Sequence, residues 1–141
     1  MSINDLPALS ILRSKMQWHQ ERQRVLLVAA GIGVTALRAL LEDLPAGSRP
    51  AVVLRAGRPE DLVLISEVRE LVQHKRGTLH ELVGRREQAS VTGATLRRLV
   101  PDLDRRDVYV CGPEGFVDDV VAIVRSLGVP DEAIHHEAFA L

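Results

Sequence analysis

The chain has 141 residues, a formal net charge of −1 at pH 7 and a single cysteine. This length suits one domain with a sizeable core, and the nearly neutral charge gives no sign of nucleic-acid binding or a polybasic membrane anchor. One cysteine excludes an internal disulfide and a cysteine-rich metal site, which fits a reducing compartment. The longest apolar stretch is far too short to span a bilayer, and the N-terminus lacks the layout of a signal peptide. We therefore expect a soluble, cytoplasmic protein.

The first 23 residues differ from the rest of the chain. Leu6, Leu9, Leu12 and Met16 recur at the spacing of an amphipathic helix, and residues 17–24 are strongly polar. We expect residues 1–23 to form a helix or linker and residues 24–141 to form one folded domain.

An apolar run from Val25 to Ala30 stops at Gly31 and Gly33, and leucines then recur at helical spacing as far as Leu44. A short apolar run bounded by glycine predicts a strand covered on both faces, as in a parallel sheet. The glycines permit a sharp turn, and the free amide groups of the following helix would face a phosphate or pyrophosphate. Taken alone, such a turn is as often only a tight connection.

The remainder of the chain alternates strands and helices. We expect further strands at 51–55, 78–83, 107–111 and 134–139, and helices at 34–44, 62–73, 95–100 and about 116–127. This order predicts an α/β fold, a doubly wound parallel sheet of about five strands with helices on both faces. Ligands of such sheets bind at the carboxyl ends of the strands, where the strand order switches. That edge would hold residues 31–35, 55–58, 111–116 and the C-terminus.

Gly31, Gly33 and Ala36 satisfy a loose dinucleotide fingerprint, which expects an acidic residue about twenty positions further on. This chain has Arg55 there, with Arg58 shortly after. A guanidinium suits a phosphate better than a ribose hydroxyl, so the site would favour NADP over NAD. A solvated loop explains the two arginines equally well.

Cys111 ends the fourth expected strand, just before a helix whose positive end can lower the pKa of a thiol. A thiolate nucleophile, as in rhodanese or a cysteine phosphatase, would need a cradling loop with a following arginine. Glu114 and Val117 occupy that loop, and no arginine follows before Arg125. The thiolate hypothesis is therefore disfavoured, and a buried, unreactive cysteine is the main alternative to a functional one.

Two clusters of polar residues, at 118–119 and 135–137, do not predict a functional site. His135, His136 and Glu137 are neighbours in an expected strand, so alternate side chains point to opposite faces and no metal site is expected. Asp118 and Asp119 are most simply the water-facing side of a helix.

From about Arg24 to Phe139 the sequence resembles the pyridine-nucleotide domain of the ferredoxin–NADP reductase superfamily, especially its bacterial ferric-reductase-like and NADPH-oxidase-like members. Four segments in this order and spacing carry the resemblance: residues 30–35 (AGIGVT), 54–61 (LRAGRPED), 110–113 (VCGP) and 137–139 (EAF). The resemblance implies that residues 24–141 are an NAD(P)-binding domain.

The resemblance also implies a role for each matching residue. The glycine turn would cradle the pyrophosphate, and arginines after the second strand would meet the 2′-phosphate. The implied cofactor-binding residues are Gly31, Ile32, Gly33, Val34, Thr35, Arg55, Arg58, Cys111, Gly112, Pro113, Glu114 and Phe116. The implied catalytic residues are Thr35 and Cys111 beside the nicotinamide, Phe139 covering the flavin ring, and Glu137 nearby.

The sequence departs from the family pattern in two respects. Ala36 stands where the family usually has proline, and the flavin-binding barrel that normally precedes this domain is missing from the 141 residues. Two residues, Ala140 and Leu141, also extend past the aromatic Phe139. The implied cofactors are NADP or NAD, with FAD on a flavin-binding domain supplied in cis or in trans. If the chain is cut from a longer membrane-associated reductase, a membrane-embedded haem domain is a further expected partner.

We therefore expect the NAD(P)H-binding half of a flavin-dependent oxidoreductase. It would present nicotinamide for hydride transfer to a flavin on another domain or subunit, and would not turn over alone. The alternative is a non-catalytic nucleotide-sensing module. A pure sensor needs the pyrophosphate turn but has no reason to keep Thr35, Cys111 and Phe139 around a nicotinamide.

Overall fold

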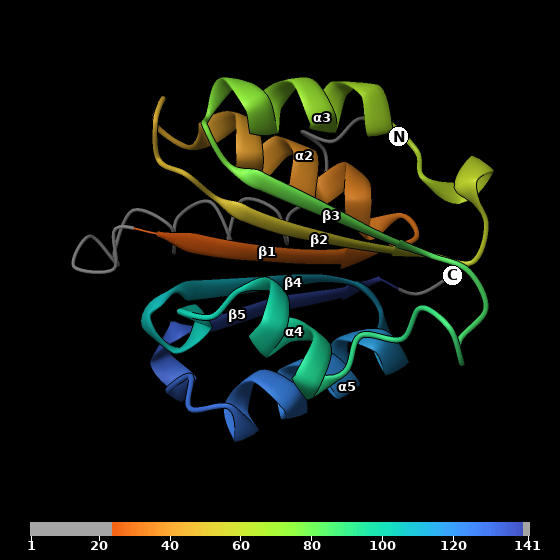
Figure 1. The fold of residues 1–141 in the computed structure, drawn as a ribbon, viewed down its shortest axis with the longest axis vertical. Coiled ribbons are helices and arrows are strands. Elements are labelled where there is room, and N and C mark those ends of the chain that lie inside the picture. The colour runs from red at the N-terminus through yellow and green to blue at the C-terminus, as the bar shows by residue number, and fades with distance from the viewer. Residues whose placement is uncertain (1–23, 140–141) are drawn as a thin grey trace.

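A computed structural model describes residues 24–139 and shows one parallel sheet with helices on both faces (Figure 1). Its strands are β1 (Val25–Ala30), β2 (Ala51–Ala56), β3 (Thr78–Val83), β4 (Asp107–Pro113) and β5 (Ile134–Phe139), and its α-helices are α2 (Gly33–Asp43), α3 (Ile65–His74), α4 (Gly93–Leu99) and α5 (Glu114–Ser126). Short 3-10 turns occupy Pro59–Asp61, Leu103–Arg105 and Asp131–Ala133. The order β3-β2-β1-β4-β5 confirms the predicted doubly wound α/β fold.

β1 lies at the centre of the sheet, and every one of its residues is buried. It pairs with β2 from Leu26↔Ala51 and with β4 from Val25↔Asp107. The chain therefore turns from one side of β1 to the other between β3 and β4, so the switch in strand order falls between β1 and β4. The glycine turn that leaves β1 opens at this switch.

Two apolar cores lie on opposite faces of the sheet. Leu27 and Ala29 of β1 pack on the face that carries α2 and α3, whereas Leu26 and Val28 pack on the face that carries α4 and α5 (Figure 1). This alternation is the two-residue period of a strand buried on both sides.

The largest differences from the predicted element boundaries fall at α3, at α4 and at the junction of β4 with α5. Helix α3 begins at Ile65 rather than Leu62, because a 3-10 turn and the left-handed Leu64 (φ 59°) intervene. Helix α4 begins two residues early, since the Thr92 hydroxyl accepts a hydrogen bond from the Thr95 amide at 3.1 Å. Strand β4 continues to Pro113, where α5 starts directly.

The helix or linker expected over residues 1–23 lies outside the described residues. Among residues 24–139, none of the helices combines the length and the apolarity needed to cross a membrane.

Candidate nucleotide-binding site

The turn between β1 and α2 brings the backbone of three elements into close contact. Gly31 has φ 57°, a left-handed conformation that favours glycine. A Cβ atom on Gly33 would lie 2.3 Å from the carbonyl oxygen of Cys111 in β4. The start of α2 therefore packs directly on the end of β4, and only glycine fits at position 33.

The amide groups of this turn are partly used within the chain. The Val34 and Thr35 amides donate to the carbonyl oxygens of Gly31 (3.2 Å) and Ile32 (3.1 Å). The prediction of free amides at the helix start is wrong for these two. Among residues 24–139, the Ile32 and Gly33 amides make no backbone hydrogen bond and are the donors that the turn offers to an anion.

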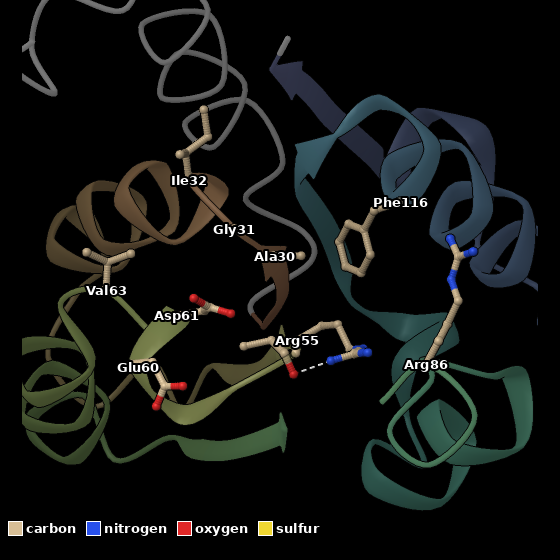
Figure 2. A pocket seen from close by; sticks show the side chains of 11 residues that line it. Ala30, Gly31, Ile32, Arg55, Glu60, Asp61, Val63, Arg86 and Phe116 are labelled. Atoms are coloured by element: carbon tan, nitrogen blue, oxygen red, sulfur yellow. Dashed lines mark hydrogen bonds between the residues drawn. The ribbon is translucent and has the colours of Figure 1, made fainter. Parts of the chain in front are cut away.

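A cavity of about 530 Å³ opens beside the turn, over the carboxyl ends of β1 and β2 (Figure 2). Its lining residues are Ala30, Gly31, Ile32, Arg55, Ala56, Gly57, Glu60, Asp61, Val63, Arg86 and Phe116. The predicted site residues Gly31, Ile32, Arg55 and Phe116 are thus brought together here. Of the large apolar residues in the described range 24–139, Ile32 and Val63 are the most exposed, at 47% and 49%, and both line this cavity.

Arg55 is bound to its own sheet. Its Nη1 donates to the carbonyl oxygen of Ala56, and also to that of Leu82 in β3 at 3.4 Å. Figure 2 shows the side chain reaching toward Phe116 and Arg86, away from Asp61 and Glu60. Arg55 therefore joins the carboxyl ends of β2 and β3 while it forms one wall of the cavity.

Two acidic residues form the opposite wall. A Cβ atom built on Gly57 would lie 3.9 Å from Oδ2 of Asp61, so this carboxylate returns to the end of β2. Glu60 lines the cavity beside it. Neither residue is a predicted site residue, because the 3-10 turn at Pro59–Asp61, which folds Asp61 back, leaves no periodic pattern in the sequence.

Two further arginines behave differently from the sequence prediction. Arg58 does not line the cavity; its side chain is 77% exposed and lies 3.9 Å from Glu60. Arg86, which the prediction missed, does line it, and its guanidinium makes no ion pair or hydrogen bond with any other residue of the described range 24–139. Arg86 follows β3 in a loop, and only the sheet order places it here.

The residues predicted to meet the nicotinamide lie on the other side of the glycine turn. The register pairs Cys111 with Glu137 and Pro113 with Phe139, so these residues meet at the carboxyl ends of β4 and β5. Phe139 packs partly on the core beneath α2, the helix that carries Thr35. The remaining predicted residues Gly33, Val34, Gly112, Pro113 and Glu114 lie at the helix starts between the two sides, and none of this group lines the cavity.

Cys111 is a buried, protonated thiol. Its side chain is 1% exposed, and burial together with the Glu137 carboxylate raises its pKa to about 12. The expectation that the following helix lowers this pKa is wrong, because desolvation outweighs the helix dipole. The geometry therefore agrees with the sequence argument against a thiolate nucleophile.

The histidine pair separates as strand alternation predicts. His135 is buried, with Nε2 3.3 Å from Oδ1 of Asp107 and its ring 4.6 Å from that of Tyr109, while His136 is exposed. These groups lie at the amino end of β4 and β5, away from the cavity.

A glycine turn at the switch point of a doubly wound sheet, beside a cavity with apolar and charged lining residues, defines a nucleotide-binding α/β domain. The comparison with known families specifies it: residues 27–122 match the oxidoreductase NAD-binding domain, and the chain belongs to this family. This confirms the expected ferredoxin–NADP reductase superfamily. The narrower likeness to ferric-reductase-like and NADPH-oxidase-like members stays a prediction.

Curated relatives carry this domain within longer chains. A flavohemoprotein of Vibrio cholerae is 30% identical over 128 residues, covering 86% of this chain and 32% of the relative. The ferredoxin reductase component of a Mycolicibacterium smegmatis 3-ketosteroid-9-alpha-monooxygenase is 32% identical over 119 residues, covering 81% and 33%. The chain thus spans about a third of the length of these relatives.

Solved structures share the fold. The Amycolatopsis cytochrome P450 reductase GcoB superposes with a TM-score of 0.69 at 16% identity, over 86% of this chain and 39% of its own. The CS-b5R domains of human Ncb5or, in the NAD⁺ form, give 0.66 at 24% identity, over 87% and 38%. These likenesses support the five-stranded architecture independently of sequence.

Proposed function

We propose that this domain binds a pyridine dinucleotide across the glycine turn and presents its nicotinamide to a flavin on another domain. The adenosine half would occupy the cavity, the pyrophosphate would lie at Ile32 and Gly33, and the nicotinamide would extend toward Cys111 and Glu137. One observation carries the proposal: a single turn at the switch point separates a cavity lined by apolar and charged side chains from Cys111, Glu137 and Phe139 at the ends of β4 and β5.

The residues present fit such a ligand. The close approach at Gly33 seats the start of α2 directly on β4. Within residues 24–139 the Ile32 and Gly33 amides then have no backbone acceptor and can donate to a diphosphate. When bound, the nicotinamide supplies the hydride, so this chain contributes orientation and electrostatics. Cys111 would offer a neutral, dry surface beside the ring, since burial keeps its thiol protonated.

We further propose NADH rather than NADPH as the physiological donor. Asp61 stands at the end of β2, where an acidic side chain accepts hydrogen bonds from the ribose hydroxyls and repels a 2′-phosphate. Arg55, on which the sequence argument for NADP depended, is already bound to Ala56 and Leu82. A relative from Escherichia coli, 33% identical over 114 residues, is named NADH oxidoreductase HCR.

The partner is proposed from the relatives. A Vibrio cholerae nitric oxide dioxygenase structure is described as a flavohem-like FAD/NAD-binding domain, and this chain covers 50% of it. We propose that a flavin-binding domain accompanies this domain in the same way. The membrane-embedded haem domain and the cytoplasmic location stay predictions.

Calorimetric titration of the chain with NADH, NADPH and ADP tests the binding step. Because the cavity lies on the adenosine side, ADP should bind within about threefold of NADH, and NADPH about tenfold more weakly than NADH. Absence of saturable binding by any of the three would contradict the proposal.

Stopped-flow reduction of flavin tests the catalytic step against the sensing alternative. With the flavin-binding half of its own or a related reductase added, NADH should reduce the flavin. A sensing module would bind NADH without any change in flavin absorbance.

A further inference from the structure

A second, smaller crevice of about 110 Å³ opens from the same edge, between α5 and the loop that follows β3. Three of its lining residues, Arg55, Arg86 and Phe116, also line the large cavity, so the two spaces adjoin. The others are Ser90, Val91, Asp119 and Val120. A ligand in the cavity can therefore extend into the crevice.

The crevice has two apolar sides and one acidic group. Phe116, Asp119 and Val120 are three and four residues apart on α5, so they share one helix face. Phe116 and Val91 belong to the partly buried margin of the core, and Val120 is fully inside it. An aromatic ring beside two valines and a planar guanidinium suits a flat heterocycle, which stacks on such groups.

Asp119 distinguishes this crevice from a purely apolar slot. Within residues 24–139 its carboxylate makes no hydrogen bond or ion pair, although Arg86 lines the same crevice. Its neighbour Asp118 does not line the crevice. The structure thus separates two residues that the sequence could only describe together as a water-facing pair.

We propose that this crevice receives the base of the nucleotide and that Asp119 selects adenine through its exocyclic amino group. The inference rests on the proposed function. Adenine presents an amino donor at position 6, whereas guanine and hypoxanthine present a carbonyl acceptor there. A carboxylate that faces position 6 accepts a hydrogen bond from the amino group and repels the carbonyl oxygen, so Asp119 is a specificity-determining residue.

A competing use of the crevice is phosphate binding between Arg55 and Arg86. Asp119 argues against it, because an unpaired carboxylate in the same small space opposes a dianion. Arg55 is also held by two carbonyl oxygens. Phosphate binding there would make NADPH the tighter ligand and leave base identity without effect.

The test compares ADP with inosine diphosphate, which differs at the atoms that Asp119 would read. The wild-type chain should bind ADP about tenfold more tightly than inosine diphosphate, as expected for one hydrogen bond to a charged group. Asp119→Ala should bring this ratio close to one by weakening ADP alone. Asp118→Ala, its exposed neighbour, is the matched control and should keep the wild-type ratio.

Thermal unfolding checks that each variant is folded. Both substitutions should be tolerated, because Asp118 and Asp119 are exposed on α5. Equal binding of ADP and inosine diphosphate by the wild type, or an unchanged ratio in Asp119→Ala, would overturn the base assignment and leave the nucleotide site standing. Failure of every nucleotide to bind the folded wild type would overturn the proposed function as well.

Discussion

The Asp61 carboxylate lies at the end of β2, with Oδ2 3.9 Å from the position that a Cβ on Gly57 would occupy. In the proposed function it takes the place of the acidic residue that a dinucleotide fingerprint expects at the strand end itself, where this chain has Arg55. Asp61→Asn removes the negative charge and keeps the size of the side chain. We expect NADPH binding to improve about tenfold relative to NADH, because repulsion of the 2′-phosphate is lost.

Titration calorimetry with both cofactors measures this ratio. Glu60→Gln is the matched control, since Glu60 lines the same wall but does not approach Gly57. An equal shift in both variants would mean that Asp61 acts only through the net charge of the cavity.

Gly33 and Gly115 are both helical glycines, with opposite surroundings. A Cβ on Gly33 would lie 2.3 Å from the Cys111 carbonyl oxygen, whereas one on Gly115 meets nothing within 4 Å. We expect Gly33→Ala to lower the free energy of unfolding by about 3 kcal/mol, through overpacking against rigid backbone. Gly115→Ala should leave it unchanged or raise it by up to about 1 kcal/mol, because alanine favours helix. Denaturant unfolding measures both, and equal effects would show that α2 does not press on β4 as described.

The sheet, the edge that carries the site and four of the residues that line the cavity were predictable from the sequence, and the acidic wall and Arg86 were not. The apolar run at Val25–Ala30 predicts a strand buried on both faces, and Gly31 predicts a turn after it. Both predictions use only residues that are neighbours in the sequence. Asp61 and Arg86 reach the site through a 3-10 turn and through the order of β2 and β3, which leave no periodic pattern. The direction of side chains could not be predicted either. Nothing in the sequence indicates that the Arg55 guanidinium donates a hydrogen bond to the Ala56 carbonyl oxygen.

The pKa of the Cys111 thiol was also not predictable from neighbouring residues. The position of Cys111 just before α5 predicts a lowered pKa, because the dipole of that helix favours the thiolate. Burial under α2 and beside β5 decides the outcome, and burial is a property of the assembled sheet.

The hydrogen bonds of Arg55 predict a structural role that can be separated from cofactor binding. Arg55→Met keeps much of the volume but removes the donors to the Ala56 and Leu82 carbonyl oxygens. We expect the free energy of unfolding to fall by about 1 kcal/mol, the usual net value of such bonds. Arg86→Met should leave stability unchanged, since its side chain has no partner within residues 24–139. If Arg55→Met instead weakens NADPH binding without any loss of stability, the arginine serves the cofactor and not the sheet.

The raised pKa of Cys111 predicts a loss of stability in alkali. Burial and the Glu137 carboxylate raise the pKa of this thiol from its usual value of 9.0 to about 12. Between these values the unfolded chain has lost the thiol proton and the native chain keeps it, so the unfolded state binds fewer protons. The free energy of unfolding must then fall as pH rises above 9, by up to about 1.4 kcal/mol per pH unit.

Denaturant unfolding of wild type and Cys111→Ala between pH 7 and about pH 11 isolates this contribution. Burial and Asp107 also raise the pKa of Tyr109, so some alkaline loss should persist in both proteins. The variant should be less stable at pH 7, because a buried side chain is truncated, yet its stability should decline less steeply above pH 9.

Native-state alkylation provides the second measurement: the thiol should react with iodoacetamide only at the rate of unfolding, since a protonated and buried sulfur is a poor nucleophile. Parallel declines in the two proteins, or rapid alkylation of the native chain at neutral pH, would show that the thiol ionises in the folded state.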